Sequence, residues 1–354
     1  MRRSPPDPPA RGPWDPGETG LGALGEEALI QRVARLVPVL GPGVVAGIGD
    51  DAAVVTLAGR VLVTCDIQVE GIHFTRELCA PPDVGWRALA VNLSDIAAMG
   101  GRPRYAVVSL ALPQGMAAET VDDLYRGLGE AARLYGVVVV GGNMSGSPGP
   151  LVVDVTLLGE ADRVLGRGGA RPGDRVWLSG WAGKARGGLF LLQHPEVDVP
   201  GRDRLAASYR RPEPRVALGR LLAAEPSVTA LIDTSDGVAT DLAHVARASG
   251  VGVWLDLDRV PRPVGLEEAA RAAGQDPEAW LLGGGEDYEL LFTATRDFDG
   301  IASRVAASAG VPLTPVGEVV PAGEGAWVRT SRGRVPLRPA GWDHFRRHRE
   351  EGDQ

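Results

Sequence analysis

Five short acidic segments stand out along this chain, and most of them place carboxylates beside glycine, serine or asparagine at the end of an apolar run. They lie at residues 47–51, 65–66, 92–95, 233–237 and 284–287. Carboxylates gathered in one place repel one another unless a cation lies between them. Oxygen ligands of this kind suit divalent ions that hold a polyphosphate. The pattern therefore predicts an enzyme that acts on phosphates.

The acidic residues of the first half also allow structural interpretations, and we leave both open. Asp50 and Asp51 could form a solvated turn before a strand. Asp66 ends the apolar run 61–65, where a strand end often carries a turn-forming aspartate. Asp95 lies in a helical pattern of small apolar residues, which predicts a buried carboxylate that needs a partner. An exposed helix face is the alternative for Asp95.

The glycine-rich segments of the chain have the same two interpretations. Ser235 or Asp236 could cap the helix that follows them, and a helix N-terminus also attracts phosphate. The glycines at 283–285 could be a flexible hairpin turn or could let the backbone approach a ligand closely. Residues 141–143, Gly-Gly-Asn, follow the expected strand 137–140 and fit a backbone cradle for phosphate.

The composition limits the possible partners and architectures. A chain of 354 residues exceeds one typical core, so two domains are expected. The net charge of −8 argues against nucleic acid or an anionic membrane as the main partner. Two cysteines are too few for a disulfide framework, and no membrane-length apolar stretch or signal core is present. We therefore expect a cytoplasmic enzyme.

The lysine content excludes two common routes to ATP. Lys184 is the single lysine of the chain, and Ala185 follows it. A P-loop requires Gly-Lys-Ser/Thr, and a protein kinase requires a strand lysine on the nucleotide phosphates. Any use of ATP must therefore rely on another architecture.

Apolar periodicity predicts strands and helices mixed throughout the chain. Helices are expected at residues 25–36, 86–99, 120–135, 215–224, 238–249 and 298–309. Strands are expected at residues 61–64, 105–112, 137–140, 151–158, 175–179, 251–256 and 290–293. The start of the chain, residues 1–22, is rich in proline and glycine and is expected to be a disordered tail. A turn signal at 171–174 opens a second block, so we place the domain boundary near 160–170.

Taken together, these segments resemble the thiamine-monophosphate kinases, which belong to the superfamily of aminoimidazole ribonucleotide synthetase and selenophosphate synthetase. The resemblance runs from about residue 25 to Phe345. Its most specific parts lie at residues 47–55, 66–74, 88–100, 232–242 and 284–290. The ending 341–345, Gly-Trp-Asp-His-Phe, favours the thiamine-phosphate branch.

The resemblance implies a mixed α/β (α+β) fold with two domains, like aminoimidazole ribonucleotide synthetase. An N-terminal domain at 23–163 would bind ATP and Mg²⁺ and form a homodimer, and a C-terminal α/β domain at 164–354 would complete the active site. The expected reaction is ATP-dependent phosphorylation of thiamine monophosphate to thiamine diphosphate. The expected partners are these small molecules, with no nucleic acid and no membrane.

Site residues follow from the same resemblance, position by position. Several Mg²⁺ ions would bind Asp51, Thr64, Cys65, Asp66, Asp95, Asn143, Asp233 and Asp236. ATP would contact Tyr125, Gly142, Asn143, Arg167 and Ser235. Thiamine monophosphate would contact His73, Glu286 and Trp342. The transfer would be direct, so no catalytic nucleophile is expected, and Asp66 and Asp95 would be the most critical residues through the metal.

Two positions depart from the family pattern. Asn143 stands where the family usually has a metal-binding aspartate, which removes one negative charge. Cys65 replaces a hydroxyl residue, and a neutral thiol is a poor Mg²⁺ ligand. Both changes affect the same ion site. Two other functions stay open: a superfamily enzyme with another acceptor, such as formylglycinamidine ribonucleotide, and a non-catalytic nucleotide- or thiamine-phosphate-binding protein.

Overall fold

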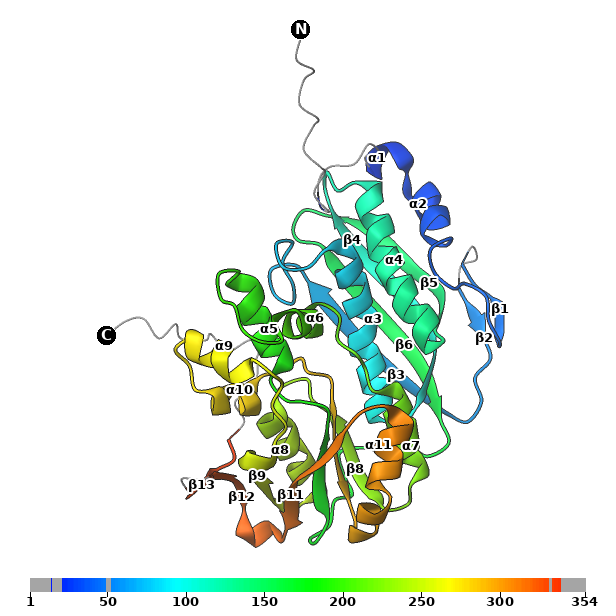
Figure 1. Cartoon of the computed structure of the whole chain (residues 1–354). Helices are drawn as coiled ribbons and strands as arrows, with labels where there is room; N and C mark the ends of the chain where they lie inside the picture. The colour runs from blue at the N-terminus through cyan, green and yellow to red at the C-terminus, as the bar shows by residue number, and fades with distance from the viewer. Residues whose placement is uncertain (1–13, 15–20, 49–51, 331–332, 339–354) are drawn as a thin grey trace. The chain divides into compact units, whose positions relative to one another are not determined.

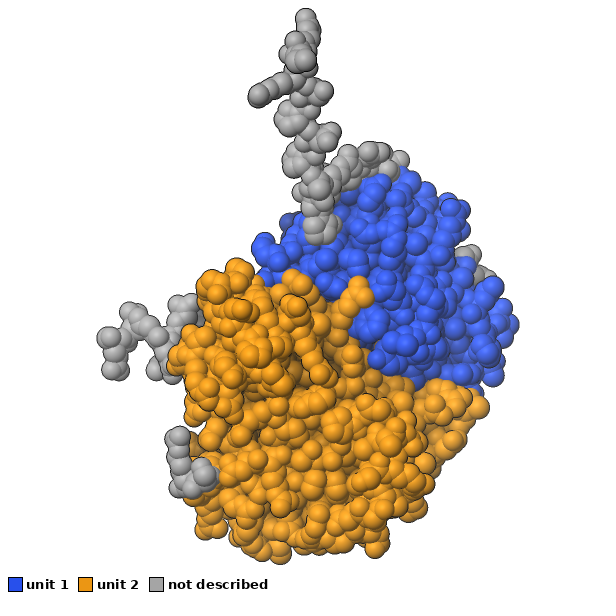
Figure 2. Space-filling model, in the orientation of Figure 1, with its two compact units in different colours: residues 1–57, 63–92, 103–158 blue, residues 58–62, 93–102, 159–354 orange. Residues whose placement is uncertain are grey.

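The computed structural model describes residue 14 and residues 21–48, 52–330 and 333–338 (Figure 1). The chain forms two compact units that alternate along the sequence (Figure 2). The first unit comprises residues 1–57, 63–92 and 103–158, and the second comprises 58–62, 93–102 and 159–354. Both contain helices and strands, which confirms the predicted mixed α/β fold class. No helix in the described ranges is long and apolar enough to cross a membrane.

A four-stranded sheet forms the framework of the N-terminal part of the chain. Its strand order is β3-β6-β4-β5, and β4 runs parallel to β5. The strands are β3 (Arg60–Val69), β4 (Arg102–Pro113), β5 (Val138–Ser147) and β6 (Val152–Ala161). A separate pair joins β1 (Val44–Ala46) to β2 (Val54–Val55), after the short helices α1 (Leu21–Leu24) and α2 (Glu26–Val33).

Helices α3 (Pro81–Ala98) and α4 (Ala118–Tyr135) pack closely against each other through glycines. A Cβ atom at Gly85 would lie 1.8 Å from the carbonyl oxygen of Leu124. A Cβ atom at Gly127 would lie 1.8 Å from the carbonyl oxygen of Pro82. The backbones of the two helices therefore touch at positions that accept no side chain. This contact fixes the start of the helix that later carries Asp95.

A seven-stranded mixed sheet forms the framework of the second unit, in the order β13-β12-β9-β11-β7-β10-β8. All neighbouring strands are antiparallel except β12 and β9. The strands are β7 (Arg175–Ser179), β8 (Val228–Asp233), β9 (Gly252–Asp256), β10 (Leu290–Ala294), β11 (Leu313–Val320), β12 (Ala326–Thr330) and β13 (Gly333–Pro336). Strand β10 lies between β7 and β8, so the segment before it reaches the end of both neighbours.

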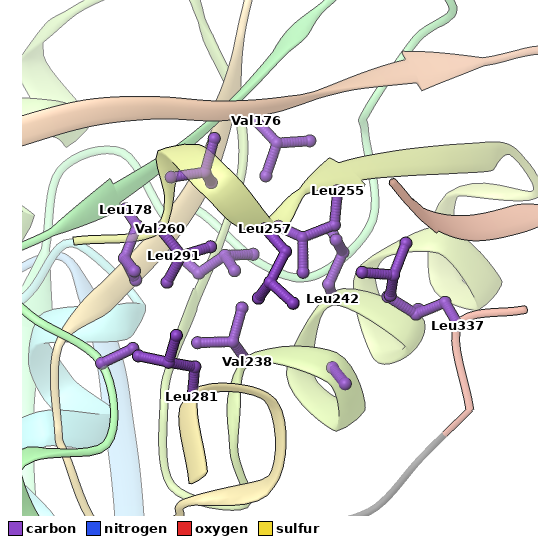
Figure 3. Packing of buried hydrophobic residues seen from close by; sticks show 14 of the residues in the cluster. Val176, Leu178, Val238, Leu242, Leu255, Leu257, Val260, Leu281, Leu291 and Leu337 are labelled. Carbon is purple, nitrogen blue, oxygen red and sulfur yellow. The ribbon is translucent and has the colours of Figure 1, made fainter. Parts of the chain in front are cut away.

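Helices cover one face of this sheet and bury the main core of the second unit (Figure 3). Leu178 and Leu291 of the sheet pack in one cluster with Leu242 of helix α8 (Val238–Ser249) and Leu281 of helix α10 (Pro277–Gly283). The helices of this unit are α5 (Lys184–Gln193), α6 (Arg202–Arg210), α7 (Val216–Ala224), α8 (Val238–Ser249), α9 (Leu266–Ala272), α10 (Pro277–Gly283) and α11 (Ala302–Ala309). Short 3₁₀ turns lie at Leu257–Arg259, Arg296–Gly300 and Ala322–Glu324.

Aromatic rings form a second, smaller packing group in this unit. The rings of Trp177 and Phe292 are stacked with centroids 6.2 Å apart, and Phe298 meets both of them edge-on. Trp177 alternates with Leu178 along β7, so its side chain points away from the main core. The sheet is therefore apolar on both faces, as expected for a central sheet between two layers.

Two predicted strand ends were wrong, because both strands continue through the polar segments. Asp66 lies inside β3, which extends to Val69, and residues 141–143 lie inside β5. Burial alternates along β3, so an acidic residue can occupy the strand without full burial. The glycines of β5 do not end it because β4 supplies a ladder as far as Pro113 opposite Ser147.

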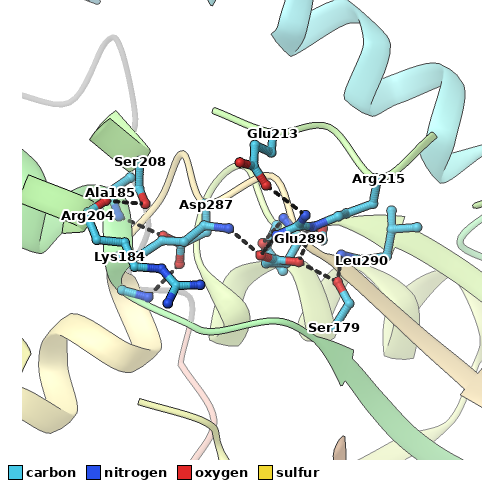
Figure 4. Close-up of polar contacts among 12 residues, drawn as sticks. Ser179, Lys184, Ala185, Arg204, Ser208, Glu213, Arg215, Asp287, Glu289 and Leu290 are labelled. Carbon is cyan, nitrogen blue, oxygen red and sulfur yellow. Dashed lines mark hydrogen bonds and ion pairs between the residues drawn. The ribbon is translucent and has the colours of Figure 1, made fainter. Parts of the chain in front are cut away.

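A buried carboxylate, Glu289, joins several elements of the second unit just before β10 (Figure 4). Ser179 donates a hydrogen bond to Glu289 Oε2 at 2.6 Å, and Arg215 binds both carboxylate oxygens at 2.8 and 2.6 Å. Lys184, the single lysine, forms an ion pair with Oε1. Burial would raise the pKa of Glu289, but Lys184 and Arg215 outweigh it and lower the pKa to about 2.

We predict that Glu289→Gln lowers the free energy of unfolding by about 3 kcal/mol or more at pH 7, because it removes the buried carboxylate that Lys184 and Arg215 share. The folded pKa lies below the ordinary value of 4.5. The ionised carboxylate therefore stabilises the fold fully above about pH 5, and this stabilisation is lost as the pH falls from 4.5 towards 2. Urea unfolding from pH 8 to pH 3 measures the difference between the two proteins.

Glu318→Gln is the matched control, because Glu318 forms a half-exposed ion pair with Arg296. Pairs of this kind contribute about 1 kcal/mol or less. Equal losses for Glu289→Gln and Glu318→Gln at pH 7 would contradict the structural role of Glu289.

Candidate functional site

Two predicted acidic segments of the second unit lie side by side, although about 50 residues of sequence separate them. Thr234 N donates to Glu289 O at 2.8 Å, and Tyr288 N donates to Thr234 O at 3.0 Å. Glu286 N donates to Ser235 O at 2.8 Å. The segment after β8 and the segment before β10 therefore form one paired unit, and Glu289 holds its base.

Backbone strain marks the second of these segments. Glu286 and Tyr288 have positive φ angles of 65° and 51°, which side-chain-bearing residues rarely adopt. Gly285 lies against the partner segment, and a Cβ atom there would be 2.5 Å from Ser235 O. Such strain persists where the surrounding structure fixes it, and it is concentrated at functional sites. The glycines therefore allow this segment to lie close to the backbone of Ser235, and the interpretation as a flexible turn is wrong.

Acidic side chains converge where β8 ends and α8 begins. Asp233 is buried, and its Oδ2 accepts a hydrogen bond from Ser94 Oγ at 2.6 Å. One oxygen each of Asp236 and Asp241 and a ring nitrogen of His244 lie within 4.8 Å of one another. Asp236 N also donates to Asp241 Oδ2 at 3.2 Å. These oxygens form a donor set that suits a hard divalent cation.

The electrostatics of this cluster favour a bound cation. Burial raises the pKa of Asp241 to about 9, with further contributions from Asp233 and Asp236. Arg167 acts in the opposite direction on Asp241, so its guanidinium lies close to the cluster. Burial and then Arg167 lower the pKa of His244. A group of carboxylates this crowded would ionise together only with added positive charge.

Asp95 lies in the last turns of α3, within the second unit. Its neighbour Ser94 is the residue that binds Asp233, and Asp95 itself is half-buried. The alternative interpretation, in which Asp95 lies on an exposed helix face, is therefore wrong.

In the first unit, β3 presents its predicted ligands to opposite faces of the sheet. Gln68 accepts a hydrogen bond from Arg87 of α3 at 3.3 Å, so the even-numbered residues face the helix. Thr64 and Asp66 share this side and are half-buried. Cys65 faces the other side, where its Sγ lies 3.2 Å from Asp154 Oδ1 and Thr156 Oγ1 donates to it at 3.4 Å.

The environment of Cys65 keeps its thiol neutral. Thr156 lowers the pKa of the thiol, but burial and Asp154 outweigh this and raise it above its ordinary value. The thiolate is the form that binds metals well. The side chain of Cys65 therefore points to the opposite face of the sheet from Thr64 and Asp66, and its neutral thiol is a poor Mg²⁺ ligand.

The other predicted residues of the first unit have specific local contacts. His73 Nδ1 accepts a hydrogen bond from Val69 N at 3.0 Å, and Asn143 Oδ1 accepts one from Met144 N at 3.0 Å. A Cβ atom at Gly142 would lie 2.0 Å from Val108 O, so only glycine fits beside β4. Tyr125 is buried in α4, which raises the pKa of its hydroxyl. Asp51 and Trp342 lie outside the described residues.

Comparison with known proteins decides the family. Residues 49–161 match the N-terminal domain of AIR synthase related proteins, and residues 171–328 match their C-terminal domain. The chain is 36% identical over 327 residues to thiamine-monophosphate kinase from Aquifex aeolicus, covering 92% of this chain and 99% of that relative. The chain belongs to the thiamine-monophosphate kinase family.

Solved structures agree with this assignment. Thiamine-monophosphate kinase from Stenotrophomonas maltophilia K279a is 34% identical with a TM-score of 0.75, covering 85% of this chain and 94% of that structure. AaThiL complexed with AMPPCP and TMP is 35% identical with a TM-score of 0.71, covering 92% of this chain and 98% of that structure.

Two further residues of the acidic cluster, Asp241 and His244, were not predicted from the sequence. Asp241 and His244 are three positions apart on α8, so they share one face of the helix, and Asp241 lies one turn after the Asp233–Asp236 segment. That spacing was the available signal. The helix-capping interpretation was wrong, because Gly237 is the N-cap and no side chain caps α8.

We predict that Gly285→Ala lowers the free energy of unfolding by about 1–3 kcal/mol, the usual range for overpacking. The added methyl group would displace Ser235 and the paired segment. Gly323→Ala is the matched control, since nothing lies within 4 Å of a Cβ atom there. Thermal unfolding of both variants measures the effect. A Gly285→Ala protein as stable as the control would disprove the close approach.

Proposed function

We propose that this protein transfers the γ-phosphoryl group of ATP to the phosphate of thiamine monophosphate, which gives thiamine diphosphate and ADP. The main support is the similarity along nearly the whole chain to thiamine-monophosphate kinases. AaThiL, one of the similar solved structures, is complexed with AMPPCP and TMP. ATP is therefore the co-substrate, and we infer that TMP denotes the acceptor, thiamine monophosphate.

The acceptor requires little activation by the protein. A phosphate monoester loses its second proton near pH 6, so it is already a nucleophilic anion at neutral pH. The main barrier is the repulsion between two anionic phosphates, and catalysis consists mostly of positioning and charge stabilisation. Direct transfer needs no covalent phosphoenzyme.

We infer that the acidic residues of both units bind Mg²⁺, and the donor set supports this. Crowded carboxylates with the raised pKa of Asp241 fit a site built for added positive charge. Asp233 and Asp236 would hold ions in the second unit. Asp95 would join them, because it directly follows Ser94, which binds Asp233. Asp51, Thr64 and Asp66 would supply oxygens in the first unit. Bound Mg²⁺ would neutralise phosphate charge.

The remaining residues of the chain would position the two substrates. Arg167 lies close to Asp241 and His244, so its charge can reach phosphate oxygens bound at this cluster. Ser235 and Glu286 are joined through their backbones, so a ligand contact at one constrains the other. We assign Ser235 to ATP, with Gly142, Asn143 and Tyr125 as further ATP contacts. We assign Glu286, His73 and Trp342 to thiamine monophosphate.

Phosphorus NMR tests the reaction directly. We expect the protein to form thiamine diphosphate from ATP and thiamine monophosphate with Mg²⁺ and to form none with EDTA. Asp236→Asn should lower the rate about 100-fold, which corresponds to about 3 kcal/mol of transition-state stabilisation. Asp198→Asn, at an exposed position outside the site, should keep the wild-type rate.

The same experiment separates the competing functions. ADP formed only when formylglycinamidine ribonucleotide replaces thiamine monophosphate would indicate another acceptor. ATP binding without turnover on either compound would indicate a binding protein. Either result would contradict the proposed reaction.

We further infer that the protein forms a homodimer through the open face of the four-stranded sheet. Val61, Val63 and Ile67 alternate along β3 and are all exposed, although they are large and apolar. Exposed apolar patches of this kind mark protein interfaces in many soluble proteins. A second copy would cover them.

We predict that Val63→Glu converts the dimer into a monomer, because it places a charge within the apolar interface. Leu134→Glu is the matched control, because Leu134 on α4 and Val63 are both 66% exposed. Light scattering after size-exclusion chromatography measures the mass of each variant. A wild-type monomer, or a Val63→Glu dimer, would contradict this interface.

A further inference from the structure

A basic cavity of about 290 Å³ lies within the second unit, between α6, the segment that follows α6, and the loops before α9 and β11. Its lining includes Lys184, Arg204, Arg211 and Arg215, with Glu213 as the single acidic residue among them. None of the described residues assigned above to ATP, thiamine monophosphate or Mg²⁺ lines this cavity. The cavity therefore needs an explanation of its own.

The lining of the cavity contains more cationic than acidic side chains. Lys184 and Arg215 share the buried Glu289, and Arg215 also pairs with Glu213 at 3.2 Å. Four of the lining residues are thus cationic and one is acidic, while the buried carboxylates of Glu289 and Asp287 both act on Lys184 behind the lining. The chain as a whole carries a net charge of −8, so this local surplus runs against the overall balance. A concentrated positive field of this kind attracts anions.

Arg204 is the residue of the cavity that is most available to a ligand. Its guanidinium carbon lies 4.8 Å from the centroid of the Trp181 ring, which orients the group by a cation–π contact. Within the described part of the chain, no carboxylate lies within ion-pair distance of Arg204. A planar guanidinium held in this way is preorganised for bidentate binding of phosphate oxygens.

The size and walls of the cavity limit what can bind there. A volume of about 290 Å³ lies near the lower end of the range for small-molecule sites, so a macromolecular segment is not expected. Pro212, Val264 and Pro312 add apolar surface beside the cations. This combination suits a compact phosphate or diphosphate group attached to a small apolar body.

We propose that this cavity is a second ligand site, separate from the phosphoryl-transfer site, which binds a small phosphate- or diphosphate-bearing molecule through Arg204, Arg211, Lys184 and Arg215. The inference does not depend on the proposed kinase activity, because it rests on the lining of this cavity alone. An anion bound in this cavity would also affect Glu289, because it would compete with that carboxylate for Lys184 and Arg215.

Calorimetric titration of the full chain with inorganic pyrophosphate, in EDTA, tests the site. Without divalent ions the phosphates cannot bind through metal, so the signal reports the cationic cavity. We expect one pyrophosphate per chain and an at least tenfold weaker Kd for Arg204→Ala. Arg220→Ala, an exposed arginine on α7 outside the cavity, should bind as the wild type does.

Each other outcome overturns the proposal. Absence of pyrophosphate binding to the wild type, or equal weakening in Arg204→Ala and Arg220→Ala, would show that the cavity holds no specific anion. The KM values for ATP and thiamine monophosphate in Arg204→Ala provide the second readout. Unchanged KM values support a separate site, whereas an at least tenfold rise in either would assign the cavity to that substrate. Arg204→Gln, which keeps most of the side-chain volume, replaces Arg204→Ala if that variant does not fold.

Discussion

The paired burial of Glu289 is the interaction on which the rest of the second unit depends. Its carboxylate joins β7 through Ser179, α5 through Lys184 and the start of α7 through Arg215. Its backbone binds Thr234, so the same residue fixes the segment that carries Asp233 and Asp236. Asp287, two residues earlier, accepts hydrogen bonds from Gly183 and Ala185 at the start of α5. Lys184, the single lysine of the chain, is one of the partners of Glu289. Because Glu289 contacts both the sheet and the acidic segment, a substitution of Glu289 would affect the site and the fold together.

The acidic cluster beside this centre shows the opposite electrostatic arrangement. Glu289 is paired with Lys184 and Arg215, whereas Asp241 is buried beside Asp233 and Asp236, which raise its pKa further, and Arg167 acts on Asp241 in the opposite direction. Folding therefore brings several carboxylates close together at this place. This is the expected arrangement for a site whose balance is completed by ions and a nucleotide. The strained backbone at Glu286 and Tyr288 lies in the segment paired with this cluster.

Much of this arrangement was predictable from the sequence, and the failures have physical causes. The motif Asp-Thr-Ser-Asp-Gly and the triple glycine identified two segments that the structure joins. Their pairing was not predictable, because antiparallel register depends on strand order across the whole sheet. Cys65 shows a limit of a different kind. Adjacent residues of a strand face opposite sides, and the expected strand 61–64, which stopped short of Cys65, hid this alternation. Asp241 was missed because a lone aspartate on an amphipathic helix resembles an ordinary polar-face residue. Lys184 appeared in the sequence only as evidence against a P-loop, since nothing local predicts a partner 105 positions away.

A crystal structure of the protein with AMPPCP, thiamine monophosphate and Mg²⁺ tests the central claim most directly, which is that the segment held by Glu289 binds the ions of phosphoryl transfer. The account predicts Mg²⁺ bonded to carboxylate oxygens of Asp233 and Asp236 and to the terminal phosphate of the nucleotide analogue. Ions and phosphates bound elsewhere, with Asp233 and Asp236 contacting neither, would contradict it.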